Sequence, residues 1–137
     1  MQRRNAPPNV GVVSDGHYAL PFSKLLALYH RAYFVIVTHH GTNHPFGINA
    51  LVEAMALGKA VLLTEGKGID IDPASLNFGV KVPAHDVTAL AAAMNRLLAD
   101  RNAAIRMGNN ARRLVESDFN TRIMSRQICR ALRAALE

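Results

Sequence analysis

The sequence has one cysteine, Cys129, and no apolar run that approaches the roughly 20 residues needed to cross a membrane. A lone cysteine excludes an internal disulfide and a metal cluster built from cysteines. No signal-peptide core follows the Arg3-Arg4 pair, so the N-terminus does not predict export. Repeats and low-complexity tracts are also missing from the sequence. We therefore expect a cytoplasmic protein without disulfides.

Acidic side chains are scarce relative to basic ones. The chain of 137 residues has 10 Asp and Glu against 16 Lys and Arg, which gives a net charge of +6 and a pI of about 10.1. This balance favours an anionic partner, whether nucleic acid, lipid headgroups or a nucleotide diphosphate, and does not choose among them. With 50% hydrophobic residues, the length suits one domain with a real core and is too short for two ordinary ones.

The order of apolar segments predicts an α/β domain. Residues 1–9 carry two arginines and two prolines and have little that could pack, so we expect a disordered tail or a linker remnant there. Residues 10–137 form the domain, in which strands and helices alternate as in a parallel sheet flanked by helices. Strands are expected at 10–13, 33–38, 60–63 and 78–82, and helices at 21–32, 48–57, 86–99, 103–117 and 121–136.

The stretch 44–64 predicts a loop, a helix and a buried strand in succession. Its helix has an apolar face at the spacing i, i+3, i+4, i+7, and Gly58 is expected to end it as a left-handed cap. Asn49 and Glu53 lie four residues apart and project together from a different side. Gly47 allows a ligand to approach the backbone, and the free N–H groups of Gly47, Ile48 and Asn49 would suit an anion. The apolar face consists of Ile48, Leu51, Val52 and Met55.

Residues 53–61, with the sequence Glu-Ala-Met-Ala-Leu-Gly-Lys-Ala-Val, resemble a segment of the donor-binding half of family 4 retaining glycosyltransferases. These enzymes have the GT-B fold, and the likeness runs from about residue 10 to about residue 119. The resemblance implies a Rossmann-like half of a GT-B architecture in which Glu53 hydrogen-bonds the ribose of a nucleotide-sugar. The family motif has two glutamates, and Glu53 corresponds to the second. The position of the first falls on Pro45 or, when the alignment is made on Phe46-Gly47, on His44.

The resemblance also implies a donor-binding set drawn from two loops and one helix start. Parallel sheets bind ligands beyond the carboxyl ends of their strands, where the loops 38–44 and 65–70 should lie. The family holds the leaving diphosphate through helix-start amides and a basic pair, and that pair is absent here unless Lys67 partly substitutes for it. The set contains His44, Phe46, Gly47, Ile48, Asn49, Glu53, Gly66, Lys67 and Gly68, with Asp70 beside it.

No residue is assigned a catalytic role, and no metal or cofactor is expected apart from the nucleotide-sugar donor. His39, His40 and His44 are close in sequence, which invites a metal site. However, adjacent residues of an extended chain point to opposite sides, and no carboxylate stands at zinc-like spacing beside them. A hydrogen bond from one of these histidines to a sugar hydroxyl or a phosphate is the alternative.

The last predicted helix carries a basic stripe and, on the same periodicity, inward-facing apolar residues at Ile123, Ile128 and Leu132. The stripe is a solvated face, or it contacts the anionic inner surface of a membrane, or it binds nucleic acid. No aromatic residues are interleaved with it and no known nucleic-acid motif is present, which disfavours the third role. The stripe consists of Arg122, Arg126, Arg130 and Arg133.

These observations lead to one expected function and two alternatives. We expect a donor-binding domain of a metal-independent retaining glycosyltransferase, a fragment or split subunit that is inactive without an acceptor-binding domain. That domain or a partner subunit would supply the acceptor of the hexosyl group. The first alternative is a degenerate binding or regulatory module, which the replaced upstream glutamate favours. The second alternative is a basic nucleic-acid-binding domain.

Overall fold

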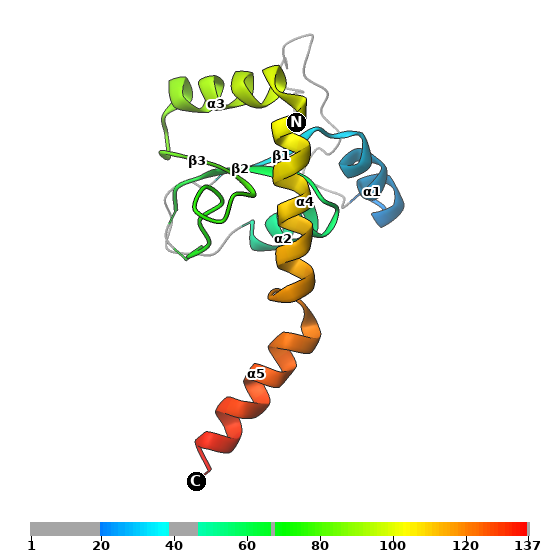
Figure 1. The fold of residues 1–137 in the computed structure, drawn as a ribbon, viewed down its shortest axis with the longest axis vertical. Coiled ribbons are helices and arrows are strands. Elements are labelled where there is room, and N and C mark those ends of the chain that lie inside the picture. The colour runs from blue at the N-terminus through cyan, green and yellow to red at the C-terminus, as the bar shows by residue number, and fades with distance from the viewer. Residues whose placement is uncertain (1–19, 39–46, 67, 137) are drawn as a thin grey trace, which may run out of the picture. The chain divides into compact units, whose positions relative to one another are not determined.

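The computed structural model describes residues 20–38, 47–66 and 68–136 (Figure 1). The chain divides into two units, Met1–Arg31 and Ala32–Glu137. In the first unit, the helix α1 spans Phe22–Arg31 and begins one residue after Pro21, whose carbonyl accepts from the amides of Lys24 and Leu25. Ser23 has a side chain of the kind that caps helices, and the sequence predicts it at the helix start, but it lies inside the first turn. The strand expected at 10–13 lies outside the described residues.

The second unit is built on a parallel sheet of β1 (Phe34–Val37), β2 (Ala60–Thr64) and β3 (Gly79–Val82) in the order β1-β2-β3. All five residues of β2 are buried, as the uniformly apolar run 60–63 predicts for the central strand of a covered sheet. The prediction that 33–38 is a buried strand is wrong in part, because Tyr33 and Ile36 are exposed. β1 is an outer strand of the described sheet, and an outer strand has a neighbour on one side only.

The described sheet is covered by helices on both faces. Successive side chains of β2 alternate between the faces, so Ala60 and Leu62 point to one side and Val61 and Leu63 to the other. The first side packs against α3 (Val87–Ala99), which contributes Leu97 to the core, and α4 (Arg101–Ser117), which contributes Ala104. α2 (Ile48–Ala56) contacts β1 and β2 and lies across the sheet from α3 (Figure 1). The expected parallel α/β arrangement is therefore confirmed.

Side-chain caps define the starts of the last three helices. The sequence predicts that Asp86 caps a helix running to about residue 99, and its carboxylate does accept from the Ala89 amide at 2.8 Å at the start of α3. Asp100 ends α3 and also starts α4 by accepting from Ala103 at 2.8 Å, so α4 begins at Arg101 rather than at 103. α5 spans Thr121–Ala134 and begins at Asn120, whose side chain accepts from Ile123 at 3.1 Å. A residue that appears to break a helix thus caps the next one.

Two predictions of buried side chains are wrong. In α3, the spacing of Leu90, Met94, Leu97 and Leu98 predicts one buried side. Leu97 is buried and Leu90 and Met94 are partly buried, but Leu98 is 51% exposed because it lies at the edge of this arc, about 100° round the helix from Leu97. In α5, Ile128 and Leu132 are 50% and 60% exposed, and no residue of this helix is buried. Helical periodicity identified these apolar faces, but neither of these residues is covered.

Candidate functional site

The helix α2 points its first turn toward the carboxyl edge of the sheet. β1 and β2 are parallel neighbours, so the chain that leaves the carboxyl end of β1 must return to the amino end before β2 begins. The last turn of α2 leads through Gly58 and Lys59 directly into Ala60, the first residue of β2. The start of α2 therefore lies on the side where β1 and β2 end, which is the side where open parallel sheets bind ligands.

Gly47 starts α2 in a left-handed conformation, with φ 87° and ψ −1°. A residue with a side chain rarely adopts this φ, so glycine is required here by the backbone. A glycine at the cap has no side-chain oxygen to accept from the first-turn amides, and the first turn contains no acidic residue. The amides of Ile48 and Asn49 thus lie in the first turn of a nine-residue helix whose cap residue has no side chain to pair with them. This arrangement suits an anion.

Glu53 lies on α2 away from the face that enters the core. Leu51, Ala54 and Met55 are fully buried, whereas Glu53 is half-buried and Asn49 is exposed. Residues four apart on a helix lie one above the other, so Glu53 and Asn49 share one side of α2, one turn apart. Glu53 is the sixth residue of the helix, about 8 Å along the axis from its start at 1.5 Å per residue. The predicted pairing of Asn49 and Glu53 on one side is thus consistent with the burial pattern.

The loop after β2 starts at the same edge of the sheet. The amide of Glu65 donates to the carbonyl of Val82 at 2.8 Å, which extends the β2–β3 ladder by one residue. Gly66 follows and is half-buried, whereas Gly68 is exposed with φ 92°. Asp70 is exposed next to the buried Ile69. By topology, Gly66 and the start of α2 share the carboxyl edge, as the sequence predicted.

Three residues of the predicted donor-binding set, His44, Phe46 and Lys67, lie outside the described residues, as do His39 and His40. The roles of Glu53 and of the helix-start amides remain predictions. In the described ranges, no group of three or more His, Cys, Asp or Glu side chains is placed to hold a metal ion. None of the helices in that part of the chain is both long and apolar enough to span a bilayer.

The end of α2 is held by a left-handed glycine, as predicted for Gly58, whose φ is 65°. The amide of Gly58 donates to Met55 and the amide of Lys59 donates to Ala54, at 3.0 and 2.9 Å. This pair of bonds is a Schellman motif, which satisfies two carbonyls that the helix itself leaves unpaired. The neighbouring carbonyl of Ala56 accepts from the guanidinium of Arg112 on α4.

Sequence reasoning missed the residues of α4 that hold α2 in place. A Cβ added to Gly108 would lie 2.0 Å from the carbonyl oxygen of Gly58, so the two backbones are in direct contact. Arg112, one turn later, donates to Ala56 and forms an ion pair with Glu116 at 2.6 Å. A glycine inside a helical pattern was the available signal, because such a glycine costs stability unless packing requires it.

Comparison with known proteins identifies the family of this chain. A model of the family "Glycosyl transferases group 1" matches residues 13–114, which is most of the chain. The chain belongs to this family. The match includes the sheet, α2 and most of α4, and it ends before α5. The resemblance of residues 53–61 to a GT-B glycosyltransferase domain is therefore confirmed.

Two similar proteins show how much of a longer protein the chain matches. Glycogen synthase of Mycobacterium tuberculosis, from either of two strains, is 37% identical over 105 residues, covering 77% of this chain and 24% of the relative. A sucrose-phosphate synthase structure from Thermosynechococcus elongatus superimposes with a TM-score of 0.71 at 30% identity, covering 85% of this chain and 29% of that chain. The chain thus spans about a quarter of the length of these relatives, and the likeness supports a Rossmann-like α/β domain.

Proposed function

We propose that this group 1 domain binds a nucleotide-diphosphate sugar and serves as the donor-binding part of a retaining glycosyltransferase. The observation that carries the proposal is the position of α2. Its start, where Gly47 supplies no side-chain cap, lies at the carboxyl edge of the sheet, and Glu53 stands half-buried on the same helix, off the core face. Family membership makes this edge the natural place for a donor.

The two ends of the donor would meet different parts of α2. The diphosphate would lie at the amides of Gly47, Ile48 and Asn49, where partial positive charge at the helix start favours an anion. Those N–H groups would also stabilise the charge that develops on the leaving diphosphate during transfer, without a bound metal. The ribose would lie farther along α2, where the carboxylate of Glu53 can accept from two adjacent hydroxyls.

Transfer of the hexosyl group requires more than this domain. An acceptor must be held against the donor, and water must be kept out of the reaction. The relatives are about four times as long as the part that matches. We therefore propose that acceptor-binding structure in the same protein or in a partner closes over the carboxyl edge, and that the 137-residue chain binds donor without transferring sugar.

The test is calorimetric titration of the chain with the diphosphate-glucose conjugates of uridine, adenosine and guanosine. At least one should bind, and Glu53→Ala should weaken its binding by about 1–3 kcal/mol because two ribose hydrogen bonds are lost. Asp118→Ala is the matched control, since it removes an exposed carboxylate at the end of α4 and should leave the affinity unchanged. Equal affinities for wild type and Glu53→Ala would refute the assigned role of Glu53.

A degenerate binding or regulatory module is the second candidate. The observation in its favour is that the upstream glutamate of the family motif is replaced by Pro45 or His44. This candidate predicts that none of the three conjugates binds, although the domain is folded. A nucleic-acid-binding domain instead predicts affinity for nucleic acid that falls steeply with salt and ignores Glu53→Ala.

A further inference from the structure

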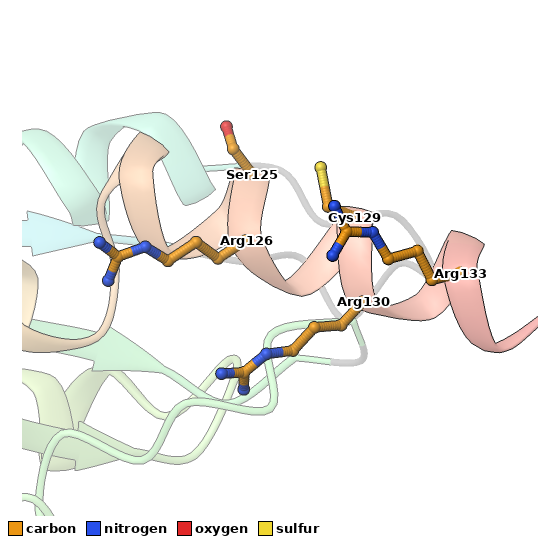
Figure 2. A pocket seen from close by; sticks show the side chains of 5 residues that line it. All are labelled: Ser125, Arg126, Cys129, Arg130 and Arg133. Atoms are coloured by element: carbon orange, nitrogen blue, oxygen red, sulfur yellow. The ribbon is translucent and has the colours of Figure 1, made fainter.

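Arginine side chains on two helices, α4 and α5, stand outside the candidate site. On α5 they line an open hollow, and the side chains around this hollow all belong to α5 itself (Figure 2). On α4, the guanidinium of Arg112 donates to the carbonyl of Ala56, on the helix that bears Glu53. Of these two groups of arginines, the one on α4 is therefore joined directly to the candidate site.

The end of α2 has a partner for each of its last four carbonyls. Three of them, at residues 53–55, accept from the backbone amides of residues 57–59. The fourth, the carbonyl of Ala56, accepts from Arg112, which is 56 residues further along the chain. The carbonyls at a helix end have no partner inside the helix and carry partial negative charge. Arg112 therefore places a cation at the negative end of α2.

Arg112 is itself held in one orientation. Its Nε donates to the Oε1 atom of Glu116 at 2.6 Å, one turn along α4, while its Nη1 donates to Ala56. A guanidinium presents its donors in a rigid plane, so two such bonds fix the direction of the group. One turn before Arg112, the backbone of Gly108 lies against the carbonyl oxygen of Gly58. The link between α4 and the end of α2 thus has a set length and a set direction.

The bond from Arg112 acts on the turn that carries Glu53. Glu53 is three residues before Ala56, about 4.5 Å along the helix axis, whereas Ile48 at the helix start is about 12 Å away. The carbonyl of Ala56 belongs to a partly exposed residue and could pair with water instead, so the arginine is not needed to satisfy it. What Arg112 adds over water is a fixed position for this turn.

We propose that Arg112 is a positioning residue for donor binding, which holds the last turn of α2 so that the Glu53 carboxylate meets the two hydroxyls of the ribose. The inference rests on the proposed function and adds to it a residue that acts through Glu53 rather than on the donor. Side chains of a binding site must be held within about 0.5 Å of their working positions, which requires support from the residues behind them. Arg112 supplies this support from α4.

The test is calorimetric titration of the 137-residue chain and its variants with the diphosphate-glucose conjugates of uridine, adenosine and guanosine. Arg112→Ala should weaken binding about fivefold, and less than Glu53→Ala does, because it lets the carboxylate move instead of removing it. Arg112→Lys restores a charged donor and should recover most of the affinity. Arg112→Met restores only the apolar length of the side chain and should not.

Two controls separate positioning from net charge and from stability. Arg113→Ala removes the same charge from the next residue of α4, whose side chain donates to Asn110 within that helix. Asp100→Ala removes the cap at the start of α4 and lowers stability without touching α2. Both variants should leave the affinity within about twofold of wild type, since neither changes a contact with the helix that bears Glu53.

A double-mutant cycle tests whether Arg112 acts through Glu53. In the Glu53→Ala background, Arg112→Ala should weaken binding less than about twofold further, because the group that it positions is gone. An undiminished loss in that background would overturn the inference, as would a loss of the same size in Arg113→Ala or Asp100→Ala.

The same titrations distinguish failure of this inference from failure of the proposed function. Weaker binding by Glu53→Ala together with unchanged binding by Arg112→Ala would refute the inference and leave the proposed function standing. No binding of any of the three conjugates by the wild-type chain would refute the proposed function and the inference with it.

Discussion

The helices α2 and α5 each carry apolar residues on one face, yet these faces lie in opposite environments. In α2, Leu51, Ala54 and Met55 are fully buried, whereas α5 buries nothing. What differs is the surface each helix meets. α2 is followed by Gly58, which contacts the backbone of Gly108, so small residues let the elements approach closely. Periodicity therefore marks a face that can be buried, and small residues on the neighbouring elements decide whether it is.

The largest expected change in stability comes from comparing the same substitution at one leucine of each helix. Leu51→Ala should lower the free energy of unfolding by about 2–5 kcal/mol, because it leaves a cavity in a packed core. Leu132→Ala, the same chemical change on α5, should lower it by less than about 0.5 kcal/mol, as expected of an exposed site. Chemical denaturation followed by circular dichroism measures both. A loss of several kcal/mol for Leu132→Ala would show that α5 packs after all.

A smaller effect is expected from Gly108→Ala. The added Cβ would meet the Gly58 carbonyl oxygen at 2.0 Å, and this oxygen belongs to the backbone and cannot turn aside, so α4 must move away from the end of α2. Overpacking of this kind costs about 1–3 kcal/mol of unfolding free energy. Asn109→Ala, at the exposed neighbouring position of the same helix, is the control and should be near neutral. A neutral Gly108→Ala would mean that the close contact contributes nothing to packing.

A third and smaller loss of stability is expected from Arg112→Ala. Arg112→Ala removes the donor to the Ala56 carbonyl and the ion pair with Glu116, and should cost about 1–2 kcal/mol. Arg106→Ala is the control, since its contact with Asp100 is a 3.9 Å pair between exposed side chains worth less than about 0.5 kcal/mol. Thermal unfolding of the two variants separates them. Equal melting temperatures would indicate that α2 does not need this link to α4.

The fold followed from the sequence where local signals agreed. The apolar run at 60–63, the glycine after α2 and the aspartate before α3 each have one physical interpretation, and the structure confirms all three. Exposure was predicted less well, because Leu98 and Ile128 lie on periodic faces whose covering depends on segments distant in sequence. The same limitation hid Asp100, whose role as a cap depends on how two helices meet.

The candidate site also has residues that the sequence could place and contacts that it could not. Gly47 and Gly66 could be placed at one edge of the sheet because strand order and direction follow from the alternation of elements. Glu53 could be placed off the core face by its spacing from Leu51 and Met55. The support from Gly108 and Arg112 could not be predicted, since it is a contact between α2 and a helix about fifty residues away. Local patterns position the ligand-facing residues, whereas long-range packing holds them there.

The smallest effect on overall stability, and the sharpest contrast with α2, is expected from Asn120→Ala. Its side chain accepts from the Ile123 amide at 3.1 Å and caps α5, and such a cap is worth about 1 kcal/mol to its helix. Because α5 buries no side chain, that loss should melt the helix locally and leave the unfolding midpoint of the sheet domain unchanged. Amide hydrogen exchange should therefore speed up in 121–134 and stay constant in β2. Asp86→Ala removes the equivalent cap from the packed helix α3 and should instead lower the midpoint, because loss of a packed helix start is felt by the core. A midpoint shift of the same size in both variants would mean that α5 unfolds together with the domain.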